Sequence, residues 1–458
     1  MKKRVIAFVM SLTIMLSLVS CGEKKSEPES GGAKIKVITW DAPASGDPEN
    51  EKERFRLMRE RLAVELPHIE LVDLSRKTGA DYYLEYDKSL MAGEAPSYTA
   101  FAYPLIPTRI KNGTIADITE FVENWDLKKE DKIITQFDEA ITSDNKWYAI
   151  PQSMYIQATL YNKKAIASSG YNLEKLPETW EEFVDVCKEV TDLSVPRIGY
   201  ALMGMDWCAW PFTAWVWSAG GEMVRPNGDG TYNLAFVEDP AIEAAMFLNR
   251  LIWKERVTQK DVLQDLADLG QDVKSGRSCF SWSSPNVFTP ADYKAYELTA
   301  DDLGTMPMPV KDKSITPPSL SGGNVFVFNP KATKEELKAA WEVVTYLNFD
   351  ENELKKQWEF DNSTGYFNYL IPGRKDLLET VFDMHTFVPE RIKEEFFAMV
   401  PNAIAEPYCP NWGELKSALA NPLQKIFLSE DLTEDQARAI LEECAESLYK
   451  QYPNSFKK

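Results

Sequence analysis

The stretch from Lys146 to Lys164, KWYAIPQSMYIQATLYNKK, constrains the fold more than any other part of the sequence. It contains a short aromatic run, Trp147–Ile150, and a longer apolar run, Met154–Tyr161, and both patterns are typical of β-strands. Pro151 separates the two runs, and proline is excluded from the middle of a sheet because it has no N–H to donate. We therefore expect the chain to leave one sheet and enter another here. The alternative is a single bent edge strand.

The length of the chain favours two lobes. A single hydrophobic core stops growing beyond about 250–300 residues, whereas this chain has 458 residues. Its 44% hydrophobic and 27% charged residues are typical of a globular protein. The sequence therefore predicts a folded protein with more than one core.

The first folded segment has the pattern of a β-α-β unit. Strands are expected over Ile35–Trp40 and Ile69–Leu74, with an amphipathic helix over Glu49–Leu66 between them. Such units build parallel sheets, and ligands bind at the carboxyl ends of the strands in these sheets. Trp40 and Asp41 lie at the end of the first strand, so they are candidates to face a ligand.

The N-terminus has the pattern of a bacterial secretory signal. The basic residues Lys2–Arg4 precede Val5–Leu16, an apolar run that is too short to span a bilayer comfortably. The sequence LVSC that ends at Cys21 resembles the lipobox, in which the cysteine becomes acylated. We expect residues 1–20 to be a signal peptide, and residues 21–34 to be the lipidated cysteine and a flexible polar tether. The alternative is an uncleaved anchor, and both place the protein outside the cytoplasm on a membrane.

Charge and residue counts exclude several functional classes. Loss of residues 1–20 removes three cations, so 48 Lys and Arg face 71 Asp and Glu, and this acidic balance disfavours nucleic-acid binding. The five cysteines after Cys21 are scattered without C-x-x-C spacing, so they predict buried thiols, with a single disulfide as the alternative, and not a zinc site. Only two histidines occur, and neither has the flanking sequence of a catalytic triad. We expect no metal, no cofactor and no nucleic-acid partner.

Tryptophan is concentrated between Met205 and Gly221, in the sequence MDWCAWPFTAWVWSAGG. Trp207 precedes a predicted helix entry, where a side chain can form a ligand platform; packing is the alternative. Further along, a buried strand is expected over Gly276–Ser284. Ser283 and Asn286, at the end of that strand, are candidates either for ligand hydrogen bonds or for turn formation.

A pair of glycines marks a second possible passage between lobes. Gly322 and Gly323 precede a strand expected over Asn324–Phe328, and paired glycines permit the backbone torsions that a hinge requires; an ordinary loop is the alternative. A third passage is expected around Gly365–Gly373. It follows an aromatic segment, Gln357–Tyr369, that is expected to be irregular, and it precedes a wholly helical tail.

Nine segments occur in the order seen in one family. They are the lipobox, the polar tether, NGTIADIT (112–119), KWYAIP (146–151), LYNKKAI (160–166), LPETWEEF (176–183), the Trp-Pro to Gly-Gly segment (210–221), GRSCFSW (276–282) and SGGN (321–324). Each is weak alone, but their order and spacing are specific and cover essentially the whole mature chain. The sequence resembles the extracellular solute-binding proteins of the maltose type, which serve ABC importers.

This resemblance implies an α/β fold of the type II periplasmic-binding-protein class. Two lobes would be joined by three crossovers, near Pro151–Met154, Ser321–Gly323 and Gly365–Gly373. Lobe 1 would comprise residues 35–152 and 323–370, and lobe 2 residues 153–322 and 371–458. The lobes would close on a sugar and deliver it to a membrane permease.

The resemblance also implies a set of ligand-binding residues. Aromatic contacts would come from Phe101 or Tyr103 in lobe 1, from Tyr155 at the joint, and from Trp207 and Trp412 in lobe 2. Gly323, at the second crossover, belongs to the same predicted site. Asn286 stands where some members have tryptophan, and Ser97 stands where members usually have aspartate, so these two positions depart from the family pattern.

The main hypothesis is a monomeric, non-catalytic lipoprotein that binds an oligosaccharide. A pyranose has apolar faces and a hydroxyl rim, which suit flat aromatic side chains with carboxylates and amides between them. One alternative is a surface glycoside hydrolase with a carboxylate pair, although no carboxylate lies in a recognisable catalytic motif. The other is the same fold with a peptide, polyamine or other non-sugar solute, for which acids without stacked aromatics would indicate a cation.

Overall fold

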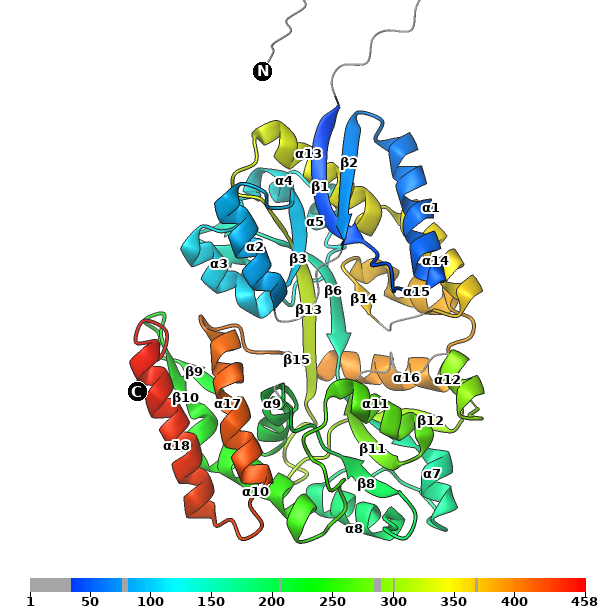
Figure 1. Ribbon diagram of the computed structural model, residues 1–458, viewed down its shortest axis with the longest axis vertical. Helices are drawn as coiled ribbons and strands as arrows, with labels where there is room; N and C mark the ends of the chain where they lie inside the picture. Colours follow the sequence, from blue (N-terminus) through cyan, green and yellow to red (C-terminus); the bar gives the residue numbers. More distant parts are fainter. Residues whose placement is uncertain (1–33, 76–80, 206, 284–289, 300, 367–369) are drawn as a thin grey trace, which may run out of the picture.

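The computed structural model describes residues 34–75, 81–205, 207–283, 290–299, 301–366 and 370–458. Over these ranges the protein is a mixed α/β structure with two lobes stacked along its longest axis (Figure 1). Lobe 1 is the part around strands β1 to β3, and lobe 2 is the part around the sheet that contains β7. The predicted signal peptide, Cys21, the tether and Asn286 lie outside the described residues.

Lobe 1 begins with the predicted β-α-β unit. Strands β1 (Ile35–Ala42) and β2 (Ile69–Ser75) pair in parallel, and α1 (Glu49–Glu65) connects them. Proline follows the helix directly, at position 67. The other elements before the joint are α2 (Asp81–Ala92), β3 (Tyr98–Ala102), η1 (Tyr103–Leu105), α3 (Ile106–Asn112), α4 (Thr119–Glu123), α5 (Asp126–Lys129), α6 (Asp138–Ile141), β4 (Thr142–Ser143) and β5 (Lys146–Trp147).

The joint, which is the segment Lys146–Lys164, does connect two sheets. This excludes the alternative of a single bent edge strand. β6 (Ile150–Ile156) belongs to the sheet with the order β14-β6-β13-β15, in which β13 also pairs with β3. β7 (Ala158–Asn162) belongs to the sheet with the order β12-β7-β11-β8. Only Gln157 separates them, and its N–H donates to the carbonyl oxygen of Leu320 at 2.8 Å.

The position of the switch differs from the prediction. The chain changes sheets at Gln157 and not at Pro151, so Met154–Tyr161 is not one strand. Pro151 lies within β6, where it pairs with Val325 beside a register shift. A bulge of this kind removes the need for a ladder N–H at that position, which is why the sheet accommodates a proline there.

Lobe 2 is built on the second sheet. In it β7 runs antiparallel to β11 (Ser278–Ser283) and β12 (Leu303–Met306), and β11 runs parallel to β8 (Ile198–Ala201). The predicted capping box of Thr179 and Glu182 is present at the start of α8. The other elements of this part of the chain are α7 (Lys163–Ser168), α8 (Trp180–Val190), α9 (Ala209–Ser218), β9 (Val224–Pro226), β10 (Tyr232–Leu234), η2 (Ala235–Val237), α10 (Asp239–Trp253), α11 (Leu266–Ser275) and α12 (Pro290–Ala295).

Strand β13 (Ser319–Phe328) is long enough to run between the lobes (Figure 1). It pairs with β15 (Ala403–Ala405) at its start, with β6 along its middle and with β3 at its end. The glycine pair lies inside this strand and not before it, and neither glycine has a positive φ. The prediction that the two glycines precede the strand and adopt the unusual torsions of a hinge was therefore wrong.

Close contacts explain the two glycines. A Cβ at Gly322 would overlap the ring of Tyr155, and a Cβ at Gly323 would overlap the carbonyl oxygen of Ser153 and the ring of Phe137. The pair thus allows side chains and backbone from β6 and α6 to approach β13 on both of its faces.

The chain after β13 returns to lobe 1 before it enters its helical tail. The segment predicted to be irregular lies mostly in α14, which ends at Gly365 in the left-handed conformation. Beyond it, β14 pairs with β6, and β15 interrupts the tail that was expected to be wholly helical. These elements are α13 (Lys334–Phe349), α14 (Glu351–Thr364), β14 (Ile371–Pro372), η4 (Lys375–Leu377), α15 (Leu378–Met384), α16 (Glu390–Met399), η5 (Val400–Asn402), β15, α17 (Trp412–Phe427) and α18 (Glu434–Gln451).

Each lobe has its own hydrophobic core. Lobe 1 packs residues such as Val37, Phe328 and Val344 together, and lobe 2 is filled around Phe183 and Trp215. A further apolar cluster continues across the junction along β6, β7 and β13. The five cysteines after Cys21 are buried, and no two described cysteines form a disulfide. No described helix has the length and apolar character needed to cross a membrane.

Candidate functional site

Several predicted site residues lie within the lobes. Trp40 is buried in lobe 1, where its ring makes an edge contact with Tyr82 at 5.9 Å between centroids. Phe101 is buried beneath the guanidinium of Arg109, which lies 4.1 Å from the ring centroid. Ser283 is buried at the end of β11, beside β7. This conformation places these three side chains in packed positions.

Asp41 is exposed, but one oxygen of its carboxylate already accepts hydrogen bonds from other side chains of the protein. Oδ2 accepts hydrogen bonds from the hydroxyl of Tyr98 at 2.6 Å and from the guanidinium of Arg59 at 3.2 Å. Burial, together with Asp41, raises the pKa of Tyr98 well above its usual value, so the phenol remains a donor. Asp41 therefore holds the carboxyl end of β1 in place.

Three predicted residues do come together, and they do so around a residue that was not predicted. Tyr103, Tyr155 and Trp412 all lie near Glu406, on the segment that joins β15 to α17. The hydroxyl of Tyr103 donates to the backbone oxygen of Glu406, and the Glu406 N–H donates to the backbone oxygen of Ser321 at 2.9 Å. This segment thus contacts lobe 1 and the crossing strand β13 at the same point.

The carboxylate of Glu406 is buried but only half bonded. Oε1 accepts from Nε1 of Trp412 at 2.7 Å and from the ammonium of Lys416. Oε2 has no hydrogen bond to any described residue, although the residue as a whole is only 3% exposed. Unlike Nε1 of Trp210, Oε2 is not fully enclosed by the protein, so it is an acceptor that a ligand can reach.

Tyr155 and Trp210 add donors at the same junction. Their rings meet edge to face at 5.8 Å between centroids, and Trp210 makes a second edge contact with Trp282 at 4.9 Å. The indole Nε1 of Trp210 is buried and lacks a hydrogen-bond acceptor among the described residues. Burial, followed by the charge of Glu406, raises the pKa of Tyr155 well above its usual value, so its hydroxyl keeps its proton.

Trp207 lies at the exposed margin of this group. Its side chain is 54% exposed, and the ammonium of Lys416 lies 5.8 Å from the ring centroid. The same ammonium lies 5.9 Å from the ring of Trp412 and is bonded to Glu406, so it connects the exposed indole to the buried carboxylate. A large exposed indole of this kind offers a flat apolar surface to a ligand.

The face of β13 beside Tyr155 is small and polar. Tyr155 is paired with Gly322, and Ser153 is paired with Asn324, which is exposed although it occupies the middle of a central strand. Because side chains alternate along a strand, Gly322 and Asn324 face the same way as Tyr155. We call Tyr155, Trp207, Trp210, Asn324 and Glu406 the junction site.

Sequence reasoning missed Trp210, Asn324 and Glu406. Asn324 is a polar residue within an apolar strand, and Glu406 is a lone acid between Ala403 and Pro407. Both are local signals that could have been noticed. That Glu406 Oε2 and the Trp210 indole N–H have no hydrogen-bond partner among the described residues depends on how distant segments pack together. No local sequence pattern reveals such packing.

The junction site can both donate and accept hydrogen bonds beside aromatic rings. Glu406 Oε2 accepts, Trp210 Nε1 donates, and the hydroxyl of Tyr155 can do either. Lys416 compensates the charge of Glu406. The arrangement therefore suits a neutral, polyhydroxylated ligand with an apolar face.

Comparison with known proteins identifies the family to which the chain is similar. The family model of the bacterial extracellular solute-binding proteins matches residues 68–354. A putative binding protein of Brucella abortus is 24% identical over 389 residues, which is 78% of this chain and 87% of that protein. The maltotriose-binding protein of Pyrococcus abyssi is 23% identical over 430 residues, which is 93% of this chain and 83% of the relative.

Solved structures share the fold. The solute-binding protein of an ABC transporter from Thermotoga lettingae, bound with alpha-D-tagatose, superposes with a TM-score of 0.73 at 20% identity. The match covers 91% of this chain and 99% of that chain. The expected α/β fold, with two lobes as in the maltose-binding proteins, is therefore confirmed, whereas the residue bounds of the lobes stay a prediction.

Proposed function

Because the chain belongs to the family of bacterial extracellular solute-binding proteins, we propose that it captures a carbohydrate at the junction site for an ABC importer. The ligand is bound between the lobes and released unchanged. The relatives include proteins named for binding maltotriose and diacetylchitobiose, and these names support an oligosaccharide as the solute.

One observation carries this proposal. At the junction, the carboxylate oxygen Oε2 of Glu406 has no donor among the described residues, and the buried indole N–H of Trp210 lacks an acceptor among them. A buried unpaired polar atom costs about 1–3 kcal/mol, and a sugar hydroxyl can satisfy either atom because it both donates and accepts. A cation would satisfy only the carboxylate, and an apolar solute would satisfy neither.

The aromatic side chains favour the same ligand class. Tyr155 packs against Trp210, and Trp207 lies beside the Lys416 ammonium that bonds Glu406, so ring surface borders the polar atoms, as a pyranose with apolar faces requires. Contacts from both lobes favour a closed form when the ligand binds, because only differential affinity for that form shifts the equilibrium.

The remaining parts of the proposal concern the location and partners of the protein. Cys21, at the end of a lipobox-like sequence, would carry a lipid that anchors a monomer to the outer surface of a membrane. The tether of residues 21–34 would allow the lobes to reach the permease subunits. The protein acts as a binding component and not as an enzyme.

A thermal-shift screen of the purified protein against mono- and oligosaccharides tests the proposal. A ligand that binds only the native state raises stability by RT ln(1 + [L]/Kd), so a matching sugar should raise Tm in a dose-dependent way. Trp207→Ala should abolish this shift without lowering the Tm of the free protein, because the side chain is 54% exposed. Leu193→Ala, which removes another exposed apolar side chain of lobe 2, is the matched control. An unchanged shift in Trp207→Ala would remove that residue from the site.

A further inference from the structure

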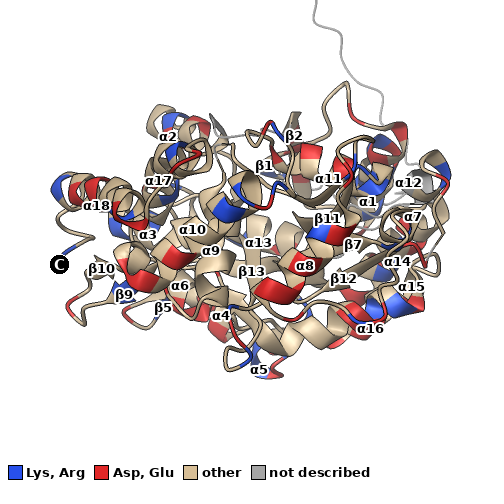
Figure 2. Ribbon diagram, turned by 90° about the horizontal axis from the view of Figure 1, so that it is seen from below, with Lys and Arg blue, Asp and Glu red and all other residues tan. Residues whose placement is uncertain are grey.

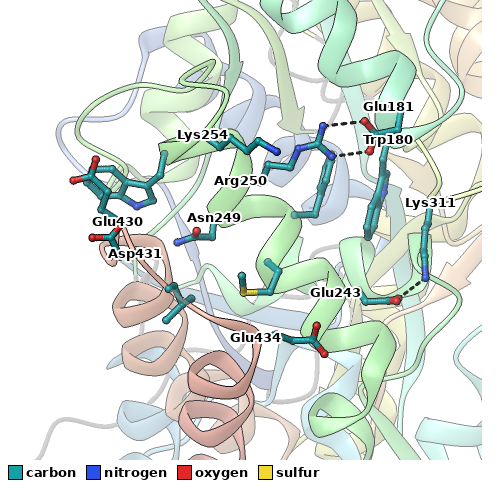
Figure 3. Close-up of a pocket in the computed structure, with 14 residues that line it drawn as sticks. Trp180, Glu181, Glu243, Asn249, Arg250, Lys254, Lys311, Glu430, Asp431 and Glu434 are labelled. Carbon is teal, nitrogen blue, oxygen red and sulfur yellow. Dashed lines mark hydrogen bonds and ion pairs between the residues drawn. The ribbon is translucent and has the colours of Figure 1, made fainter.

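A cavity in lobe 2 shares no residue with the junction site. It has a volume of about 820 Å³ and follows one face of α10, from Glu243 to Lys254 (Figure 3). One wall is the start of α8 with Lys311, and the other is the loop between α17 and α18. Trp253, Met246 and Leu432 supply apolar surface within it.

Charges on the first wall are already compensated. Arg250 makes a bidentate ion pair with Glu181, with nitrogen–oxygen distances of 2.6 and 2.9 Å, and its Nε donates to Glu255 at 2.8 Å. The ammonium of Lys311 bonds to Glu243 at 2.6 Å. Figure 3 shows both pairs joined across this wall. This side of the cavity therefore has little unpaired charge to offer a ligand.

Charges on the opposite wall are not compensated. Glu430 and Asp431 are exposed, and neither side chain has an ion pair or hydrogen bond to a described residue. Lys254 is the cavity cation that has no ion pair among the described residues. The loop between α17 and α18 thus presents two carboxylates to a cavity in which one ammonium remains unpaired.

Asn249 adds a hydrogen-bond acceptor to the lining of the cavity. The residue is 5% exposed, and its Nδ2 donates to the backbone oxygens of Ile426 and Ser429, both at 2.8 Å. These bonds use both hydrogens of the amide and fix its orientation. Its oxygen Oδ1 has no partner among the described residues, so a well-buried side chain in the lining of the cavity also awaits a donor.

From these groups we infer that the cavity binds an organic cation, namely an ammonium or guanidinium group on an apolar stem. Asn249 Oδ1, Glu430 and Asp431 are all acceptors, and the two carboxylates outnumber the one unpaired ammonium of Lys254, which leaves net negative charge for a ligand that only donates. The apolar stem would lie against Met246, Trp253 and Leu432, and a cation is attracted to an indole ring. A metal ion fits less well, because the described chain has no group of three or more His, Cys, Asp or Glu side chains placed to hold one.

Two sources could supply this chemistry, and the test separates them. Cadaverine represents a free amine, and the capped peptide acetyl-Leu-Lys-Leu-amide represents a lysine side chain of a partner protein. Pentane-1,5-diol has the length of cadaverine without its charges. Calorimetric titration of the purified protein should detect cadaverine or the peptide, and should detect no binding of the diol. The probe that binds more tightly shows whether the cavity prefers a free amine or a lysine side chain of a partner protein.

Paired variants distinguish the cavity from the general attraction of an acidic protein, whose Asp and Glu residues lie on many elements (Figure 2). Glu430→Gln with Asp431→Asn should weaken amine binding at least tenfold. Glu442→Gln with Glu443→Gln, which removes two exposed carboxylates from the body of α18, should change the affinity less than twofold. Equal losses in the two double variants, or no binding of either amine, would overturn the inference. Sugar binding at the junction site should be the same in both variants, so this test can fail without affecting the proposed function.

Discussion

Lobe 2 contains two groups of aromatic side chains that look alike and differ in their polar atoms. In the core, Trp180 stacks on Phe247 at 4.3 Å between centroids, and its Nε1 donates to Ser218 at 3.1 Å. At the junction, Trp210 is packed between Tyr155 and Trp282, but its Nε1 has no acceptor among the described residues. The core group is complete within the protein, whereas the junction group is not.

This difference teaches how to separate structural from functional aromatic residues. Burial alone does not do so, because Tyr103 and Trp412 are as buried as Trp215 and yet border the junction site. An unpaired polar atom is the more telling sign, since it marks the place where a partner is missing. Trp210 has such an atom, whereas Tyr103 and Trp412 reach the site through their bonds to Glu406. Substitutions in the two groups should therefore act on different quantities.

The largest effect is expected in the core. Trp215→Ala should lower the free energy of unfolding by about 3–5 kcal/mol, because it removes a large side chain that is 2% exposed. Urea denaturation measures this loss. The sugar affinity of the folded protein should remain unchanged. If the variant does not fold, the milder Trp215→Phe keeps the test available, and a change in affinity alone would contradict the distinction.

Glu406→Gln should produce the reverse pattern. A hydrogen bond to a charged group contributes about 1.5–3 kcal/mol, so sugar affinity should fall by about one to two orders of magnitude when Oε2 becomes an amide nitrogen. Calorimetric titration with the sugar found by thermal shift checks this. Because Glu406→Gln leaves Lys416 without its counter-ion, the double variant with Lys416→Met controls for the lost ion pair. Unchanged affinity in both would exclude Glu406 from the site.

Gly322→Ala should affect both quantities. The added Cβ would overlap the ring of Tyr155, and overpacking costs about 1–3 kcal/mol. We expect a lower Tm and a weaker sugar complex, since Tyr155 must move. Gly46→Ala is the matched control because a Cβ there meets nothing within 4 Å. A Gly322→Ala protein that binds sugar normally would show that the position of Tyr155 is not important.

The smallest effect comes from removing single indole N–H groups. Trp180→Phe loses a hydrogen bond and leaves the Ser218 hydroxyl, which still donates to the backbone oxygen of Trp215, without its donor. It should therefore be less stable than Trp210→Phe by about 0.5–1.5 kcal/mol. Trp210→Phe should instead weaken sugar binding. Denaturation and titration of both variants give the comparison directly. Equal stabilities with equal affinities would mean that the two indoles are equivalent.

Local patterns predicted most of the elements correctly. The β-α-β unit, the capping box of Thr179 and Glu182, and a change of sheets within Lys146–Lys164 all depend on neighbouring residues, although the chain changes sheets at Gln157 and not at Pro151. Helix α14 was missed because its charges obscured the apolar pattern. Those charges are paired with α1, as in Arg61–Glu353 at 2.6 Å and Arg54–Asp361 at 2.7 Å, and this pairing cannot be seen in the sequence.

The site was harder to predict than the fold. Aromatic residue types pointed to the region, and Tyr155 and Trp207 lie where a ligand could contact them. Trp40 and Phe101 belong to the same residue types and lie in a core. The distinction depends on contacts across hundreds of residues, such as Tyr103 with Glu406, which one sequence without geometry does not contain.

Strand β13 also determines how the protein can open. Its backbone is bonded to β15, β6 and β3 in turn, so the lobes share a continuous ladder and not a slack loop. A change in the angle between them must twist this ladder, and the strain is then spread elastically over many hydrogen bonds, each of which bends only slightly. In the proposed function, such a ladder would restore one preferred angle between the lobes after each release of ligand.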